Sequence, residues 1–195
     1  MDEKQATSLR ILDAASKRFL HYGYQKTTMN EIARDLSMST GNLYRFYPSK
    51  LDIAEALAIK SENVEFYALE NIVQQDIPSI DKLRKFAFRI FKDTYDHIAE
   101  SKKIYEIAQV IINERPQYAN RRLERERKLL VQIFEQGIEA KSLSINGDLN
   151  ETALAFQCAT MRFRYGYLPQ NADFETIAHD LDLVLDLITS GIASK

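Results

Sequence analysis

The sequence predicts an all-α protein, and three observations support that prediction. Only six glycines and four prolines occur in 195 residues, and each proline stands where a helical pattern breaks. Apolar residues recur with the 3.6-residue period of amphipathic helices along most of the chain. No segment alternates polar and apolar residues between hairpin turns, so we predict no β-strand. We expect about nine helices, of which the first three are short.

Local capping signals delimit the three short helices. Gly23 follows the last residue of the first helix in a position that favours glycine, and Thr28 with Glu31 forms a capping box at the start of the second. Ser39 caps the third helix, which must end before Pro48 because the residue preceding a proline is pushed out of the helical region. The expected ranges are 7–21, 28–36 and 40–46.

The remaining helices are longer and have similar signals. Ser49 with Asp52 resembles a further capping box, Pro116 suits the first turn of a helix, and Asp173 caps the last one. The charged run RRLERERK at residues 121–128 is interpreted as a solvated helix face. The expected ranges are 50–75, 80–99, 102–113, 116–141, 149–168 and 174–192.

Composition and charge exclude several classes of function. The net charge of −2 argues against attraction of the whole protein to nucleic acid, so any DNA contact has to come from a basic patch on one face. No uncharged apolar stretch approaches the length of a membrane span. The N-terminal segment MDEKQATSLR lacks the apolar middle of a signal peptide, and we therefore expect a cytoplasmic protein. The single cysteine, Cys158, rules out an intrachain disulfide, and its apolar surroundings predict a buried side chain.

Residues 27–50 have the layout of a helix-turn-helix DNA reader, in which two short helices are joined by a tight turn. We expect Leu43 and Tyr47 to pack back onto the preceding helices. Four side chains of the segment 40–46 then point away from the core, where they can meet the edges of base pairs: Thr40, Asn42, Tyr44 and Arg45.

Several residues of this segment have chemistry suited to DNA. The Thr28 hydroxyl and the free amides beside it can hold a phosphate, and Lys50 can meet another as a point charge. Tyr44 offers a hydroxyl and an aromatic body, while Arg45 can read guanine or bind the DNA backbone. Gly41 is unfavourable inside a helix, so either close approach to a phosphate or close packing on the preceding helix has to explain it.

Residues 11–57 resemble the DNA-binding module of the tetracycline-repressor (TetR) family. The aromatic segment LYRFYPSK and the capped segment TTMNEIA carry the resemblance, although the turn reads Leu36-Ser37-Met38 where the family often has a glycine. The resemblance implies a helical homodimer that binds a palindromic operator, usually as a repressor, and is released by a small ligand in its C-terminal body. The implied DNA-facing residues are Thr28, Ser39, Thr40, Gly41, Tyr44, Arg45 and Lys50.

The chain divides into an expected DNA-binding domain, residues 1–50, and a helical ligand-binding and dimerisation domain, residues 51–195. The segment 174–192 is apolar nearly all round, and the segment 149–168 carries small residues that permit close helix approach. We predict that these two helices pair across a two-fold axis in a homodimer. The alternative is that both belong to the core of a monomer.

The central helices contain aromatic side chains that could line a pocket for an apolar or aromatic effector, together with an arginine that could anchor an acidic one. Packing in the core is the alternative for each of them. The effector itself is unknown. The candidate residues are Phe91, Tyr95, Tyr105, Phe134, Phe156 and Arg162.

Two other functions were weighed against a ligand-responsive repressor. The three histidines stand far apart, and no HxxxH, GxSxG, Walker or GxGxxG pattern occurs, so we predict no enzyme, no catalytic residue, no metal and no cofactor. A DNA-binding activator or scaffold that ignores small molecules is the other alternative.

Overall fold

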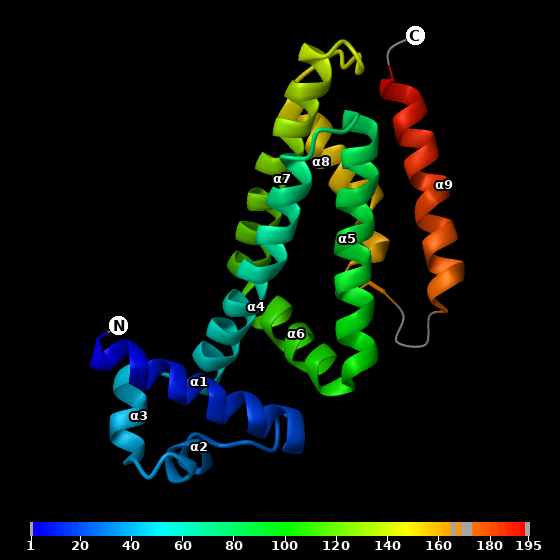
Figure 1. Ribbon diagram of the computed structural model, residues 1–195. Helices are drawn as coiled ribbons and strands as arrows, with labels where there is room; N and C mark the ends of the chain where they lie inside the picture. Colours follow the sequence, from blue (N-terminus) through cyan, green and yellow to red (C-terminus); the bar gives the residue numbers. More distant parts are fainter. Residues whose placement is uncertain (1, 165–166, 169–172, 194–195) are drawn as a thin grey trace.

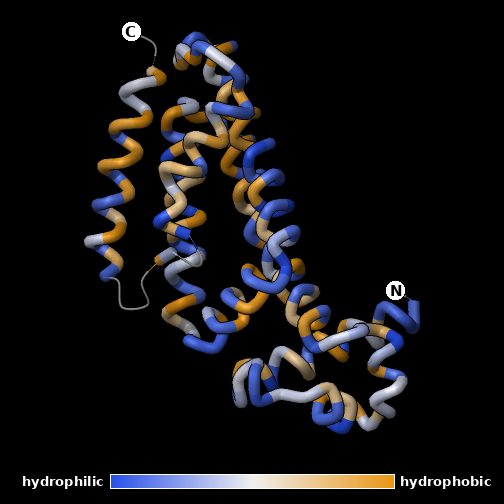
Figure 2. Tube along the Cα trace, turned by 180° about the vertical axis from the view of Figure 1, so that it is seen from behind, coloured by the Kyte–Doolittle hydropathy of each residue, from blue (hydrophilic) through white to orange (hydrophobic). Residues whose placement is uncertain are grey.

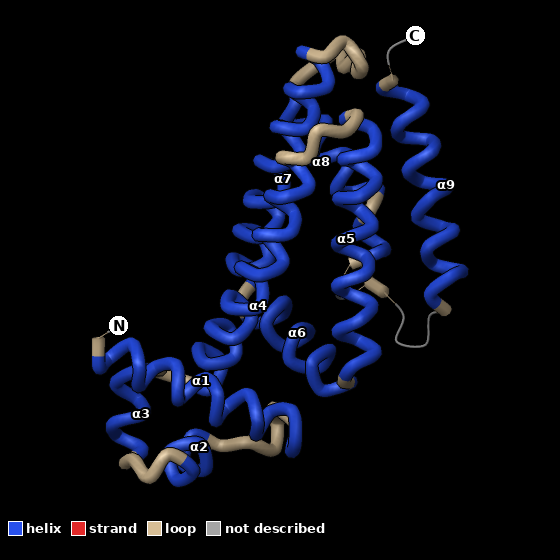
Figure 3. Tube along the Cα trace, viewed as in Figure 1, coloured by secondary structure: helices blue, strands red, loops and turns tan. Residues whose placement is uncertain are grey.

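The computed structural model describes residues 2–164, 167–168 and 173–193, and the all-α prediction is confirmed (Figures 1 and 3). Short connections join the helices, and the only pairing of extended residues in the described part is an isolated bridge between Leu143 and Ala193. The elements are α1 (Glu3–Tyr22), α2 (Met29–Asp35), α3 (Thr40–Phe46), α4 (Lys50–Val73), α5 (Ser79–Glu100), α6 (Lys102–Glu114), α7 (Pro116–Glu139), α8 (Leu149–Ala159), the 3-10 turn η1 (Met161–Phe163) and α9 (Phe174–Ile192).

Helices α1–α3 form a small N-terminal module at one end of the molecule (Figure 1). Helix α4 leaves this module and runs into a bundle with α5, α7 and α8, while α9 lies along α5. Helix α6 lies between the module and the bundle and contacts α1, α4, α5 and α7. None of the described helices is both long and apolar enough to cross a lipid bilayer.

Two clusters of buried apolar side chains hold these parts together. The first joins α1, α2 and α3 to the start of α4, and it also includes Ile111 of α6 and Tyr118 of α7. The second fills the bundle and includes the later part of α4 from Phe66 onward. Helix α4 therefore contributes to both cores, and the first core extends beyond residue 50.

The predicted caps are present and explain where the helices begin. The Thr28 side chain accepts from the Glu31 amide while the Glu31 carboxylate accepts from the Thr28 amide, which is a complete capping box. Ser39 and Ser49 cap α3 and α4 through the amides three residues on. Asp173 caps α9 in the same way. These contacts are local, so the sequence alone was sufficient to predict them.

The prediction that one helix spans residues 149–168 is wrong. Helix α8 ends at Ala159, and Thr160 turns its hydroxyl back to the carbonyls of Phe156 and Gln157, a bond that competes with regular helix formation. The chain then makes the η1 turn, and Arg164 at its end is buried and paired with Glu126 of α7. Pro169, the expected end of the helix, lies outside the described residues.

The charged run at 121–128 is solvated only in part, because Arg121, Glu124 and Lys128 are exposed whereas Glu126 is buried. Glu126 is completely buried between Arg164 and Arg122, whose Nε lies 3.3 Å from its carboxylate. Arg122 also donates to Glu65 of α4 at 2.7 Å. The prediction of a buried Cys158 is wrong as well, because its side chain is exposed on a face of α8 that the described chain leaves uncovered.

The packing of α7 against the segment after it leads to a stability prediction at Gly137. A Cβ atom there would lie 2.3 Å from Leu143 Cδ1 and 3.0 Å from Ser79 Cβ. We expect Gly137→Ala to destabilise the protein by about 1–3 kcal/mol through overpacking, measured by urea unfolding. The matched control is Gly41→Ala in α3, where a Cβ would meet nothing within 4 Å and no loss is expected. Equal stability of Gly137→Ala and the wild type would contradict this close packing.

Candidate DNA interface and adjoining cavity

The turn between α2 and α3 is tight although it contains no glycine. Ser37 takes up the left-handed conformation, with φ of +52°, and the Met38 amide returns to the Ala33 carbonyl at 3.0 Å. A serine in this conformation costs on the order of 1 kcal/mol relative to glycine, and the buried contacts on either side of the turn offset that strain. The departure from the family pattern therefore leaves the helix-turn-helix geometry intact.

The inner faces of α2 and α3 are fixed by apolar packing and by the ionic contacts of Arg18 with Glu31 and Asp35. Ile32 and Leu43 are fully buried in the first core, and Tyr47 packs against it with its hydroxyl 2.7 Å from Ser8 Oγ. Arg18 of α1 donates two hydrogen bonds to Asp35 at the end of α2, at 2.5 and 2.9 Å. These bonds hold the pKa of the Asp35 carboxyl below its usual range. Helix α2 is thus tied to α1 at neutral pH.

The outer face of α3 is open to solvent. Tyr44 is 49% exposed, Ser39, Gly41 and Arg45 are exposed, and Thr40 is half-buried. Packing on α2 does not explain Gly41, because a Cβ atom at that position would have no neighbour within 4 Å. Close approach of a phosphate to the Gly41 backbone is the other explanation, and it stays a prediction.

Thr28 and Lys50 are already engaged within the chain. The exposed Thr28 hydroxyl donates to Glu31 at 2.9 Å, in addition to the capping bonds. The Lys50 ammonium donates to the carbonyls of Tyr24 and Thr27 at 2.6 and 2.8 Å and lies 4.2 Å from the centre of the Tyr24 ring. Burial lowers the pKa of Lys50. Lys50 therefore joins the α1–α2 loop to the start of α4, a structural role that the sequence did not reveal, and one ammonium hydrogen is left for another acceptor.

A cavity of about 570 Å³ lies between the N-terminal module and the bundle. Helices α1, α4, α5, α6 and α7 enclose it, together with the segment around η1. Its volume is within the range of sites that bind drug-sized molecules. Small side chains leave this space open: Ser16, Ala54, Ala58, Ser61, Ala108 and Ala119.

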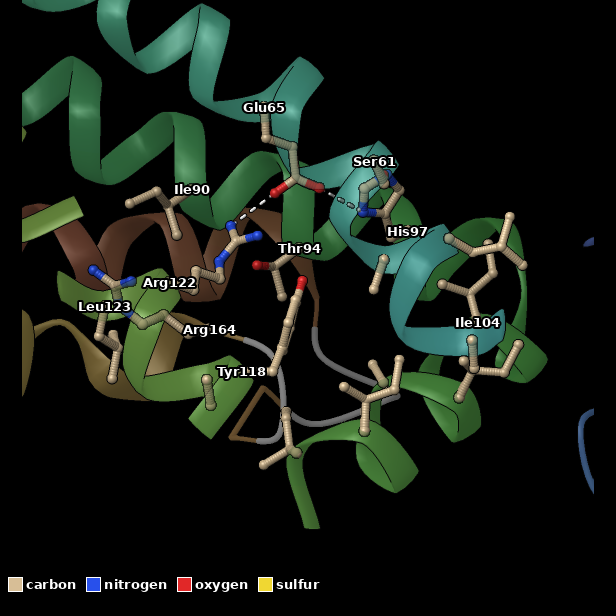
Figure 4. Close-up of a pocket in the computed structure, with 18 of the residues that line it drawn as sticks. Ser61, Glu65, Ile90, Thr94, His97, Ile104, Tyr118, Arg122, Leu123 and Arg164 are labelled. Atoms are coloured by element: carbon tan, nitrogen blue, oxygen red, sulfur yellow. Dashed lines mark hydrogen bonds and ion pairs between the residues drawn. The ribbon is translucent and has the colours of Figure 1, made fainter. Parts of the chain in front are cut away.

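Charged side chains in the wall of the cavity form a connected network (Figure 4). The Glu65 carboxylate lies between Arg122, at 2.7 Å, and His97 Nδ1, at 3.8 Å. Arg122 also pairs with Glu126, and Glu126 pairs with Arg164, so the five charged or titratable groups form one network. Burial raises the pKa of the Tyr118 hydroxyl, which also lines the cavity, so the hydroxyl remains a hydrogen-bond donor at neutral pH.

None of the six predicted effector residues lines this cavity, and their role in effector binding stays a prediction. Phe91, Phe134 and Phe156 are buried in the second core, where Phe91 stacks on Phe174 with ring centres 5.1 Å apart. The other three also lie elsewhere: Tyr95 packs on Phe174, Arg162 is exposed beside Asp180, and Tyr105 borders a smaller hollow with Tyr24. Large aromatic rings fill space in this protein, whereas the cavity is lined mainly by small and aliphatic side chains.

Helices α8 and α9 present apolar side chains to solvent. On α9 Leu183 is 55% and Leu187 78% exposed, although Leu181 and Leu185 on the opposite face are fully buried. Apolar residues recur along this helix in Figure 2. On α8 Leu154 is exposed beside Cys158. Exposed apolar side chains that lie together on one face are typical of an interaction surface, and α9 exposes two such residues four positions apart.

Comparison with known proteins agrees with the geometry. Residues 11–57 match the family model for bacterial regulatory proteins of the tetR family. Over 130 residues the chain is 25% identical to the HTH-type transcriptional repressor KstR2 of Mycobacterium tuberculosis, a match that covers 66% of this chain and 65% of that protein. The solved structure of the ketosteroid transcriptional regulator KstR2 aligns over 97% of this chain and 96% of that one, with a TM-score of 0.59 and 21% identity.

Two further solved structures have the same fold along nearly the whole chain. A transcriptional regulator from Cytophaga hutchinsonii is 26% identical, with a TM-score of 0.67, and the alignment covers 94% of this chain and 97% of that one. FadR of Thermus thermophilus, a TetR family transcriptional repressor in complex with lauroyl-CoA, is 21% identical with a TM-score of 0.65, over 93% of this chain and 92% of that one. Residues 11–57 therefore carry the DNA-binding segment of the tetR family of bacterial regulatory proteins, and the chain has the fold of solved transcriptional regulators, one of them a TetR family repressor, along nearly its whole length.

Proposed function

We propose that this protein is a transcriptional repressor that binds a palindromic operator as a homodimer and is released from it by a small effector. One observation carries the proposal: helix α3 buries Leu43 on its inner face and exposes polar side chains on its outer face. In a helix-turn-helix protein this face lies in the major groove. Such a regulator acts in the cytoplasm, where its operator is accessible.

The proposed DNA contacts are those of the sequence analysis. Tyr44 and Arg45 read base edges from α3, while Ser39, Thr40 and the backbone at Gly41 meet phosphates. Thr28 adds a phosphate contact at the start of α2. Lys50 takes part through its remaining ammonium hydrogen, since the carbonyls of Tyr24 and Thr27 accept the other two. In functional terms residues 1–50 form the DNA-binding domain, and residues 51–195 bind the effector and form the dimer.

The effector that suits the cavity has an apolar body and one polar end. Aliphatic side chains are the largest group in the lining of the cavity, and its charged groups Glu65, Arg122 and Arg164 belong to one ion-pair network. A homologous regulator is named for ketosteroids, whose ring system is apolar, and a structural relative was solved with lauroyl-CoA, which joins an apolar acyl chain to the large and charged coenzyme A group. We therefore propose an acyl or similarly apolar effector that ends in a carbonyl, carboxylate or thioester. A regulator that ignores such molecules would instead fit the activator or scaffold alternative.

The dimer is proposed to form through α8 and α9, which would bury Leu183, Leu187, Leu154 and Cys158. Apolar surface buried between two copies contributes about 25 cal/mol per Å² before the costs of association. A two-fold axis also suits palindromic operators, because it places two copies of α3 in successive major grooves about 34–36 Å apart.

Selection of bound duplexes from a random DNA pool tests the whole proposal at once. We expect a palindrome with half-sites one helical turn or somewhat more apart. Recovery of no enriched sequence at low salt would reject DNA recognition by α3. A single half-site would retain DNA reading and reject the dimer.

Replacing Arg45 by alanine should alter sequence preference. If Arg45 reads a guanine, its loss removes about 1–3 kcal/mol of discrimination at one base pair of each half-site, while binding to random duplex DNA changes little. Competition between operator variants measures this effect. Lys92→Ala, which removes an exposed positive charge from α5, is the matched control. An unchanged ranking of operators by Arg45→Ala would show that this residue binds backbone only.

Replacing Gly41 by alanine should separate packing from DNA contact. The added methyl group has free space in the unbound protein, so thermal stability should stay the same or rise. If DNA backbone approaches Gly41, operator affinity should fall about tenfold, which corresponds to about 1.4 kcal/mol. Fluorescence anisotropy with a labelled operator measures this. Full affinity of the alanine variant would remove Gly41 from the interface.

Replacing Leu187 by glutamate should dissociate the dimer, because two carboxylates would meet near the two-fold axis without a counter-charge. Light scattering at micromolar concentration should give a dimer for the wild type and a monomer for Leu187→Glu. The matched control is Val64→Glu, since Val64 is 69% exposed on α4 outside the proposed interface, and this variant should remain dimeric. A monomeric wild type refutes the pairing of α8 and α9.

A further inference from the structure

We propose that the effector touches the DNA-binding module directly, with its apolar end resting on α1 and its polar end at Glu65 and Arg122. This inference rests on the proposed effector function and specifies how that function is carried out. The cavity is not confined to the C-terminal bundle, because Ser16, Phe19 and Leu20 of α1 are part of its wall.

The three α1 residues differ in their relation to the cavity. Phe19 is 1% exposed and belongs to the first core, where its ring meets Tyr24 with centres 5.3 Å apart. Leu20 is 45% exposed, and Ser16 is half-buried. A molecule seated against them would lie against the core that positions α2 and α3. The same helix, α1, holds the end of α2 through the pair between Arg18 and Asp35.

The distribution of polarity orients the occupant. Figure 4 shows Arg122 and Arg164 on one side of the cavity, together with Ile90 and Leu123, and Ile104 of α6 on the other side, with Ser61 and His97 nearer to it. Leu57 of α4 and Ile107 of α6 line the cavity and also pack against the first core, to which α1 belongs. An uncharged chain can be buried there without loss of hydrogen bonds, whereas a polar end would have to give up its water without compensation. The polar end therefore lies at Glu65 and Arg122, and the apolar end faces α1.

Helix α6 connects this apolar end to the DNA-binding module at two points. At its start, the Lys103 ammonium donates to the carbonyls of Leu20, at 3.1 Å, and His21. At its end, Arg115 pairs with Asp52 at 3.0 Å and with Glu55 at 3.3 Å on the first turns of α4. The cavity lies along α6 between these two attachments. An occupant that separates α6 from α1 therefore displaces the module as a unit.

A series of effector probes with matched variants tests this arrangement. The probes are straight-chain alkanoyl-CoA thioesters from butanoyl to hexadecanoyl, and the measurements are calorimetric affinity and release of a labelled operator duplex from the full-length protein. Each methylene buried in the cavity should increase affinity about fourfold until the chain reaches α1. Release of the operator should begin only at the chain lengths that reach α1.

Two substitutions on α1 should move that limit in opposite directions. Ser16→Leu fills the α1 end, so the best chain should become about two or three methylenes shorter, with a loss of at least about tenfold for the longer probe. Leu20→Ala enlarges the same end and should favour a longer chain. Lys17→Leu is the control, because Lys17 is exposed on α1 and does not line the cavity. Thermal unfolding and operator binding without any probe confirm that each variant is folded.

The outcomes separate this inference from the proposed function. If alkanoyl-CoAs bind and release the operator but Ser16→Leu and Leu20→Ala leave the chain-length profile unchanged, the contact with α1 is wrong and the effector function stands. If the wild type binds its operator and none of the probes binds or releases it, both the acyl class of effector and the contact with α1 are rejected. Opposite shifts in the two variants, with no shift in Lys17→Leu, support the inference.

Discussion

Helix α4 is shared by the two hydrophobic cores, and the position of the DNA-reading face depends on that constraint. Its first turns pack Ile53 and Ala54 into the first core, while its later turns place Phe66 and Leu69 in the second. A helix of 24 residues is about 36 Å long and has no internal break to absorb a change of direction. Because Lys50 also ties the α1–α2 loop to its first residue, any tilt of α4 moves the N-terminal module.

The middle of α4 is held against α7 by charges. Arg122 joins Glu65 of α4 to Glu126 of α7, and Arg164 completes the compensation of the buried Glu126. Such networks add little net stability because desolvation of the charges offsets their attraction, yet removal of one member is costly. The network therefore specifies one relative position of α4 and α7. It also contributes charged groups to the wall of the cavity, so an occupant with a polar end meets the groups that fix that position.

Features that depend on neighbouring residues, such as helix caps, were predicted correctly from the sequence. Features that depend on contacts between distant residues, such as the burial of a charged side chain, were not. The caps at Thr28 and Ser39 and the proline after α3 are local signals, so the bounds of the DNA-reading helix were correct. Burial of Glu126 depends on Arg164, 38 residues later, and no pattern within 121–128 indicates it. The sequence analysis named aromatic residues as candidates for a pocket wall, and the cavity in the structure is lined by other residues. Apolar side chains of the core and of a cavity wall have the same sequence pattern, and the small residues that leave the space open give no distinct signal.

Contact between an effector and α1 would require little energy to control DNA binding. A tenfold change in operator affinity corresponds to a difference of about 1.4 kcal/mol in the effector's affinity for the two arrangements of the protein. Burial of a methylene group contributes about 0.8 kcal/mol, so two methylenes buried against α1 in only one arrangement are sufficient. Helix α1 is a wall of the cavity and also part of the N-terminal module that moves. An effector in contact with α1 therefore has different affinities for the two positions of the module. An effector held entirely within the bundle would have to act through α4 or α6, and part of its binding energy would be lost wherever those helices adjust.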